Sequence, residues 1–362
     1  MEFRTKGFNG YAVKYSPYFD SRLAVAASAN FGLVGNGRLY ILGLDGSGIH
    51  AERIYETSDS VYDLAWAESN ETQVIVAGGD GSIKLYDTKA PENFPVASWQ
   101  EHNREVYAVC WNLVTKDSFV SSSWDGTVKV WSPVRPDSML TLPTHSCTYS
   151  TAFSPRSPSI ISSVSSDSHL RIFDLRTPAS ASNHLVHLIP IHGYPPMPGS
   201  TLNSPPRASY PPSEALTHDW NKYRDTVIAT AGVDQLIRTF DIRNPKAGPV
   251  AILRGHDYAV RKLAWSPHLS DVLLSGSYDM TARVWSDGSA MGHPQRPELV
   301  GPEAWGEELG RMNTHTEFVT GVDWCLFGAE GWVATTAWDE RVCVWDVRNV
   351  MGPQGGRFNN GI

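Results

Sequence analysis

One pattern returns along the whole chain: a strand of small residues, an aspartate, and then an alternating strand that ends in an aromatic residue. Clear copies occupy residues 74–87, 119–132, 160–174, 227–241, 272–286 and 332–346, and a weaker copy at 32–42 has Asn36 in place of the aspartate. The seven key positions are therefore residues 36, 80, 125, 167, 234, 279 and 339. Such a repeat indicates small sheet units that bury their faces by stacking on their neighbours.

The spacing and the motif resemble those of the WD-repeat family, whose repeats each form four antiparallel strands. We therefore expect an all-β chain with one seven-bladed WD-repeat β-propeller over residues 1–350. The last copy ends near Asp346 without an outer strand. We expect the residues before Tyr11 to supply it, with a strand over Phe3–Lys6, and so to close the ring and remove two free sheet edges. Residues 351–362 are expected to be a flexible C-terminal tail.

The longest gap between key positions, 67 residues, contains a proline-rich insertion at residues 193–214. Its composition cannot form a packed core, so we expect a solvated loop that is either a passive insertion or a partner-binding arm. A second, smaller excess lies within residues 287–312.

A histidine precedes the first strand of several copies, which places it near the aspartate, a Ser or Thr four residues before that aspartate, and a closing Trp. We expect each complete set to form a buried hydrogen-bonded chain that fixes the geometry of its blade. The complete sets are His102–Asp125–Ser121–Trp131, His256–Asp279–Ser275–Trp285 and His315–Asp339–Thr335–Trp345. In two other copies Phe173 and Phe240 replace the Trp. The Ser, His and Asp residues resemble catalytic triads, but a trio that recurs at one spacing in blade after blade favours a structural role.

Two positions in each repeat are expected to point to one face of the ring, here called the top face: the fourth residue before the aromatic of the first strand, and the residue before the turn aspartate. Seven of these fourteen positions are Tyr or Trp, a composition typical of protein-binding surfaces. They are Tyr11, Tyr62, Tyr107, Trp124, Tyr149, Tyr278 and Trp338. Acidic residues lie nearby, and we expect Asp59, Asp63 and Glu105 to contribute to the same binding site. Aromatic and acidic side chains together favour an amphipathic helix with basic flanks, although each acid alone could be an ordinary loop charge.

Composition excludes several classes of partner. The net charge of −8 gives no basic surface for nucleic acid. The chain has no apolar run long enough to cross a membrane, and its first residues do not form a signal peptide. The four cysteines make no C-x-x-C pair, so we expect buried free thiols in the cytosol, with a disulfide or metal site as the alternative. We expect no cofactor and no metal.

Several segments resemble peroxin seven, the family of peroxisomal receptors for type-2 targeting signals. They include the degenerate first repeat at 7–42 and the segments 101–112, 121–131, 253–267, 276–285 and 315–324. The resemblance spans all seven repeats and departs at the proline-rich insertion. It implies a cytosolic receptor that captures cargo proteins through an N-terminal, basic, helical nonapeptide. It also implies a co-receptor (a peroxin-twenty-like protein or a long peroxin five), docking on peroxins thirteen and fourteen, and cycling to the peroxisome matrix.

Two other functions remain open. The chain could be another WD-repeat adaptor, such as the substrate-recognition subunit of a ubiquitin ligase or a chromatin reader, although only Arg261 among the top-face positions is an arginine. It could also be a propeller enzyme, which would need carboxylates or metal-binding histidines near the channel, and the sequence offers no such cluster. We therefore expect a binding protein and not an enzyme.

Overall fold

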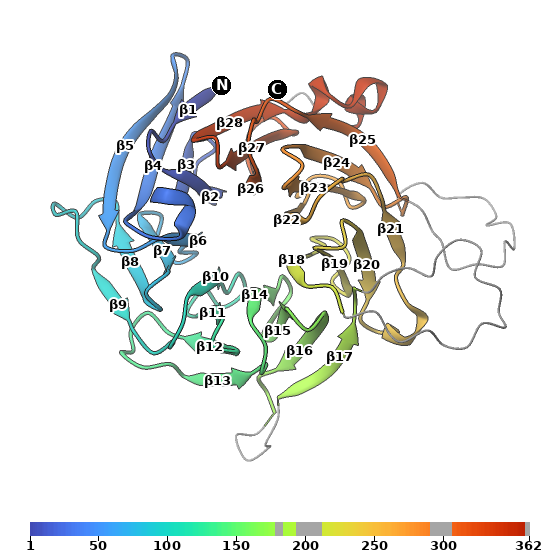
Figure 1. Ribbon diagram of the computed structural model, residues 1–362, viewed down its shortest axis with the longest axis horizontal. Helices are drawn as coiled ribbons and strands as arrows, with labels where there is room; N and C mark the ends of the chain where they lie inside the picture. Colours follow the sequence, from blue (N-terminus) through green and yellow to red (C-terminus); the bar gives the residue numbers. More distant parts are fainter. Residues whose placement is uncertain (178–183, 193–211, 290–305, 359–362) are drawn as a thin grey trace, which may run out of the picture.

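The computed structural model describes residues 1–177, 184–192, 212–289 and 306–358. Seven four-stranded antiparallel sheets stand around a common centre, which confirms the seven-bladed propeller (Figure 1). The proline-rich insertion falls mostly outside the described residues, as does much of the excess within 287–312. The strands, listed by blade from the inside outward, are β2 to β5 (Asn9–Tyr15, Arg22–Ser28, Gly37–Asp45, Gly48–Thr57), β6 to β9 (Val61–Trp66, Gln73–Gly78, Ile83–Asp87, Ala97–Trp99), β10 to β13 (Val106–Trp111, Phe119–Ser123, Thr127–Trp131, Leu140–Pro143), β14 to β17 (Thr148–Ser154, Ser157–Ser165, His169–Asp174, Leu185–Pro190), β18 to β21 (Ala215–Trp220, Val227–Gly232, Ile237–Asp241, Ala251–Leu253), β22 to β25 (Val260–Trp265, Val272–Ser277, Ala282–Ser286, Glu307–Met312), and β26, β27, β28 and β1 (Val319–Trp324, Trp332–Ala337, Arg341–Asp346, Glu2–Arg4).

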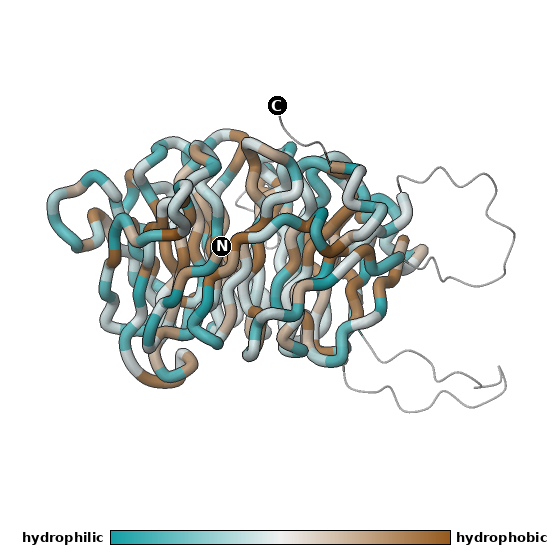
Figure 2. Tube along the Cα trace, turned by 90° about the horizontal axis from the view of Figure 1, so that it is seen from above, coloured by the Kyte–Doolittle hydropathy of each residue, from teal (hydrophilic) through white to brown (hydrophobic). Residues whose placement is uncertain are grey.

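The core lies between neighbouring blades, where large aromatic side chains meet strands of small residues. Between blades 2 and 3, for example, Trp99, Trp111, Phe119 and Trp131 are all buried in one cluster. The rings of Phe119 and Trp131 stack with centroids 6.1 Å apart. In Figure 2 brown segments lie largely along the strands, while teal predominates in the loops at the ends of the blades. Burial of this apolar surface drives the stacking of the repeats.

The N-terminal strand closes the ring, as predicted. Strand β1 pairs antiparallel with β28, with Phe3 opposite Val342, and the two strands lie side by side in Figure 1. The predicted bounds of this strand were wrong, since it covers Glu2–Arg4 and not Phe3–Lys6. The chain turns away at Thr5, whose hydroxyl donates to the carbonyl of Phe8 at 2.6 Å, and Gly7 adopts a positive φ of 79° in that turn.

The C-terminal residues after 350 were expected to be flexible, and for residues 351–358 this expectation was wrong. They form the 3₁₀ helix η4 (Gly352–Arg357), which follows η3 (Val347–Asn349), and they pack against blades 6 and 7. The buried ring of Phe358 stacks on Trp324 at 5.8 Å, and Arg357 forms an ion pair with the buried Asp271. Residues 359–362 lie outside the described residues.

Candidate functional site on the top face

The histidine sets form buried hydrogen-bonded chains inside the blades. In blade 3, His102 Nδ1 lies 2.8 Å from Asp125 Oδ2, and His102 Nε2 lies 2.8 Å from Ser121 Oγ. Trp131 Nε1 donates to the same Ser121 oxygen at 2.8 Å. Ser121 is completely buried, so its hydroxyl is inaccessible to any substrate. This arrangement holds the strands of the blade together and keeps the Ser121 hydroxyl away from the surface.

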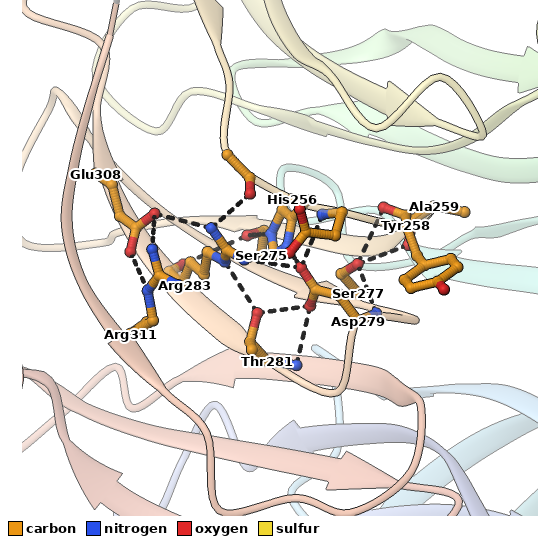
Figure 3. Close-up of polar contacts among 12 residues, drawn as sticks. His256, Tyr258, Ala259, Ser275, Ser277, Asp279, Thr281, Arg283, Glu308 and Arg311 are labelled. Carbon is orange, nitrogen blue, oxygen red and sulfur yellow. Dashed lines mark hydrogen bonds and ion pairs between the residues drawn. The ribbon is translucent and has the colours of Figure 1, made fainter.

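Blade 6 repeats the arrangement and extends it (Figure 3). His256 lies 2.7 Å from Asp279 and 2.6 Å from Ser275, to which Trp285 donates at 2.8 Å. The guanidinium of Arg283 also donates to Asp279. Burial by itself would raise the pKa of Asp279, but the hydrogen bond and charge interaction with His256 outweigh it and hold that pKa well below its ordinary value.

Blade 7 holds the third complete set in a looser form. His315 lies 3.0 Å from both Asp339 Oδ2 and Thr335 Oγ1, and Trp345 donates to Thr335 at 3.4 Å.

Blade 5 keeps the set without its last member, because Phe240 stands where the Trp would be. His192 lies 2.9 Å from Asp234 and 3.0 Å from Thr230. Thr230 lies four residues before Asp234, the same spacing as in the complete sets.

In blade 4 the turn aspartate has a different partner. Its His145 is exposed, and Arg171 instead bonds Asp167 and the carbonyl oxygen of Thr144. Ser162 receives the indole N–H of Trp220 from the next blade at 2.7 Å. In blade 4 an arginine therefore takes the place that the histidine has beside the turn aspartate of the other sets.

The first of the two top-face positions owes its orientation to a β-bulge. The inner strand of every blade shows a register shift at this position, for example between Val61 and Asp63, so that Tyr62 has no partner in the ladder. The same shift places Tyr107, Arg261 and Thr320 outside the ladder in other blades. A bulge re-aims the side chain of its extra residue. Here it turns one residue per blade toward the mouth of the central channel.

The seven predicted aromatic residues form one contiguous cluster around that mouth. Centroid distances are 5.2 Å for Tyr11–Tyr62, 4.9 Å for Tyr62–Tyr107, 5.1 Å for Tyr107–Trp124, 5.6 Å for Tyr107–Tyr149, 5.7 Å for Tyr11–Trp338 and 6.4 Å for Tyr278–Trp338. Six of the seven are partly exposed, whereas Tyr11 is buried, so it supports its neighbours from below. Burial raises the pKa of Tyr62 to about 12, so its hydroxyl remains a hydrogen-bond donor at neutral pH.

Two further aromatic residues join this cluster and were not predicted. Phe31 lies 5.4 Å from Trp338, and Phe318 lies 4.6 Å from Tyr278, both between ring centroids. Neither occupies one of the two repeat positions, because Phe31 lies in the degenerate turn of blade 1 and Phe318 precedes the first strand of blade 7. Phe318 takes the place that Glu105 has in blade 3, directly before the inner strand, where its carbonyl accepts the backbone N–H of Trp338 as that of Glu105 accepts the N–H of Trp124.

The predicted acids separate into two groups. Asp59 is partly exposed, and Glu105 is partly exposed beside Arg104, at 3.5 Å. Asp63, in contrast, was wrongly expected at the binding surface, since only 3% of it is accessible. It is the residue after the bulge, so its side chain points into the channel, where it accepts from Lys262 and from the backbone N–H of Val109, both at 3.2 Å.

The channel below the mouth is bridged by charged side chains. The guanidinium of Arg261 lies over the ring of Tyr107 at 4.8 Å, and the next residue, Lys262, meets Asp63. Farther down, Lys14 pairs with Asp323 and Lys222 with Asp219, each at 2.8 Å. These two pairs border a cavity of about 290 Å³ whose remaining walls include several tryptophans. Each lysine here has an acidic partner, which accounts for the charges inside the ring.

Comparison with known proteins agrees with this architecture. The family profile of the WD domain, G-beta repeat, matches residues 51–87, 93–132, 137–174, 247–286 and 306–346. The chain is 40% identical to the "Peroxisomal targeting signal 2 receptor" of Saccharomyces cerevisiae, over 96% of this chain and 99% of that protein. The protein of the same name from Komagataella phaffii is 38% identical, over 97% and 100%, and "Peroxisome biogenesis protein 7" of Arabidopsis thaliana is 41% identical, over 93% and 95%. The chain belongs to the WD-repeat family of peroxisomal targeting signal 2 receptors.

Proposed function

We propose that this chain is an import receptor that captures cargo proteins through their N-terminal type-2 peroxisomal targeting signal. Full-length similarity to receptors of that name supports the ligand class. The supporting observation within the structure is the cluster of partly exposed Tyr and Trp side chains on the top face, with Asp59 and Glu105 beside it. Rigid aromatic side chains bind apolar residues well, and partly exposed carboxylates attract basic ones.

The signal is a basic amphipathic helix, and its chemistry matches that surface. Aliphatic residues of the helix pack on the aromatic cluster while its Arg or Lys residues pair with Asp59 and Glu105. Asp63 does not pair with the signal, because its carboxylate already forms an ion pair with Lys262. The receptor has no catalytic role in this scheme, since the recurrent Ser, His and Asp residues are buried hydrogen-bond partners.

We further propose that the receptor meets its cargo in the cytosol together with a co-receptor, either a peroxin-twenty-like protein or a long peroxin five. The loaded complex then docks on peroxins thirteen and fourteen and cycles to the peroxisome matrix. Membership of the receptor family supports this proposal. None of the helices among the described residues could cross a membrane.

Binding of a fluorescent type-2 signal peptide to the full-length chain tests the proposal, with and without co-receptor. We expect saturable binding that is lost when the basic residues of the peptide are replaced by Glu. Absence of binding in both conditions, or equal binding of the Glu-substituted peptide, would overturn the proposed function.

A further inference from the structure

Four arginines are buried in the part of the chain that the structure describes, and one of them, Arg261, has no carboxylate partner. The other three form ion pairs, with N–O distances of 2.5, 2.5 and 2.9 Å: Arg171–Asp167, Arg238–Asp234 and Arg283–Asp279. Figure 3 shows Arg283 among its acceptors. No carboxylate oxygen of the described residues lies within 4.0 Å of the Arg261 guanidinium. Buried charges are normally paired, so Arg261 is an exception.

Arg261 stands at the mouth of the central channel. It is the bulge residue of β22, between Val260 and Lys262, and its guanidinium lies 4.8 Å from the centroid of the Tyr107 ring. Only 5% of Arg261 is accessible, but the rings of Tyr107 and Tyr278 beside it are partly exposed. A small group that passes between these rings therefore meets the guanidinium.

The phenols around Arg261 do not supply the missing negative charge. Burial raises the pKa of Tyr11 and the pKa of Tyr278, although the positive charge of Arg261 acts in the opposite direction on both. Their hydroxyls therefore stay neutral at physiological pH. The face of the Tyr107 ring stabilises the guanidinium by a cation–π contact, but it leaves the positive charge in place.

The acid that acts on Arg261 from within the channel is Asp63, and it is already paired with Lys262 at 3.2 Å. Burial holds the pKa of Lys262 below its ordinary value, and the charges of Lys14 and Arg261 add to this effect, although Asp63 opposes it. The upper channel therefore holds more positive than negative charge. Pairing with acids accounts for the lysines of the channel and leaves the charge of Arg261 over.

We propose that Arg261 is an anion-binding site that takes a carboxylate group from a molecule bound on the top face. A planar guanidinium binds a carboxylate through two parallel hydrogen bonds, and the low dielectric between aromatic rings strengthens such a pair. The site differs from the partly exposed acids Asp59 and Glu105 in sign and in place, because it attracts negative groups and lies on blade 6. It requires an acidic side chain in addition to the basic and aliphatic ones of the signal.

Trifluoroacetate, observed by fluorine NMR in a titration of the full-length chain, is the probe for the site. R261M removes the charge and keeps a side chain of similar length. R104M is the matched control, because Arg104 also lies over an aromatic ring of the cluster, Trp124 at 5.6 Å, but is exposed and already has Glu105 at 3.5 Å. We expect saturable line broadening with the wild type and R104M, and its loss with R261M. Absence of saturable broadening with the wild type, or its persistence with R261M, would overturn the site.

Melting temperatures distinguish a binding site from a structural arginine. Removal of a buried charge without a partner relieves a desolvation cost, so R261M should be at least as stable as the wild type when no carboxylate is added. R283M should melt at a lower temperature, because it breaks the ion pairs with Asp279 and Glu308. A decrease for R261M as large as that for R283M would show that Arg261 is a structural residue and would contradict the proposal.

Two binding measurements identify the source of the carboxylate, and this step rests on the proposed function. One uses a type-2 signal peptide that is amidated at its C-terminus, so that it carries no terminal carboxylate, and the other uses the co-receptor without signal. We expect R261M to weaken binding about tenfold or more for the ligand that supplies the carboxylate, as loss of a charge-assisted pair does. Unchanged affinity for both ligands would overturn the proposal. If the wild type binds neither ligand, the proposed function fails, whereas the trifluoroacetate titration still decides whether Arg261 holds an anion.

Discussion

Lys262 and Asp63 meet across the central channel, with Lys262 Nζ on β22 of blade 6 lying 3.2 Å from Asp63 Oδ1 on β6 of blade 2. One residue earlier on the same strand, Arg261 reaches over the ring of Tyr107 in blade 3. These two contacts bridge the ring directly beneath the top-face aromatic cluster. A peptide bound at that surface therefore lies above these two contacts.

The first prediction concerns this bridge. D63K places a second ammonium group against Lys262 and removes the acceptor of the Val109 N–H. We expect a loss of about 3–5 kcal/mol in the free energy of unfolding, the usual effect of breaking a buried ion pair. Chemical denaturation measures it. The control is E105K at the partly exposed Glu105, where a change below about 1 kcal/mol is expected; equal stability of the two variants would show that Asp63 is not committed to the channel.

The second prediction concerns the hydrogen-bonded set in blade 6. D279A leaves the buried His256 and Arg283 without their shared acceptor. We expect unfolding to become easier by about 1–3 kcal/mol. D257A removes a carboxylate from the same loop region that is 82% exposed, so it should leave the denaturation midpoint unchanged. A D279A protein as stable as D257A would refute the structural role of the set.

The third prediction concerns pH. Burial lowers the pKa of His218 to about 4, against an ordinary value of 6.5. Below pH 6.5 the unfolded chain therefore binds a proton that the folded chain does not, and stability should fall by roughly 3 kcal/mol between pH 6.5 and pH 4. H218L should flatten this dependence, because leucine has no group that binds a proton. The fold should tolerate the change, since Leu64 and Leu263 occupy the equivalent position in blades 2 and 6. Denaturation midpoints at several pH values measure the slope, and an identical slope in both proteins would contradict the assignment.

The fourth prediction concerns ring closure. Deletion of residues 1–4 removes β1, its pairing with β28 and the contact of Phe3 with Tyr40. The outer edge of β28 becomes exposed, so we expect a marked decrease in melting temperature and a tendency to aggregate. Deletion of residues 359–362 is the control and should have little effect. A melting temperature that both deletions leave unchanged would mean that β1 does not hold the ring.

Much of the fold could be predicted because the residues that shape each blade lie within a single repeat. The six turn aspartates and Asn36 indicate the number of blades. Residues such as His256, Ser275 and Trp285 interact within a single repeat, so their contacts could also be predicted. The bounds of the closing strand β1 were predicted less accurately, because the turn at Thr5 depends on contacts that are not part of the repeat pattern. The C-terminal segment was misjudged for a similar reason: its glycine-rich composition suggests flexibility, but Phe358 finds a partner in Trp324, far away in the sequence.

In the candidate site, too, the residues at repeat positions could be predicted and the others could not. The bulge recurs in every blade, so the orientation of Tyr62 and Tyr107 followed from their place in the repeat. Asp63 lies only one residue beyond Tyr62, and adjacent residues of a strand point in different directions. Its proximity in sequence was therefore misleading. The loop between β3 and β4 of blade 1 accepts hydrogen bonds from Tyr11 and Tyr62 and donates one to Asn9, and only the folded ring brings these residues together.

The most direct test of the account is to locate the bound signal on the receptor. A type-2 signal peptide with a photoreactive residue is cross-linked to the full-length chain, in the presence of co-receptor, and the cross-linked receptor peptides are identified by mass spectrometry. The account predicts cross-links within residues 29–37, 57–63, 103–107 and 338–340, around the aromatic mouth. Cross-links confined to the opposite ends of the blades, at residues 112–118, 266–271 or 325–331, would contradict it.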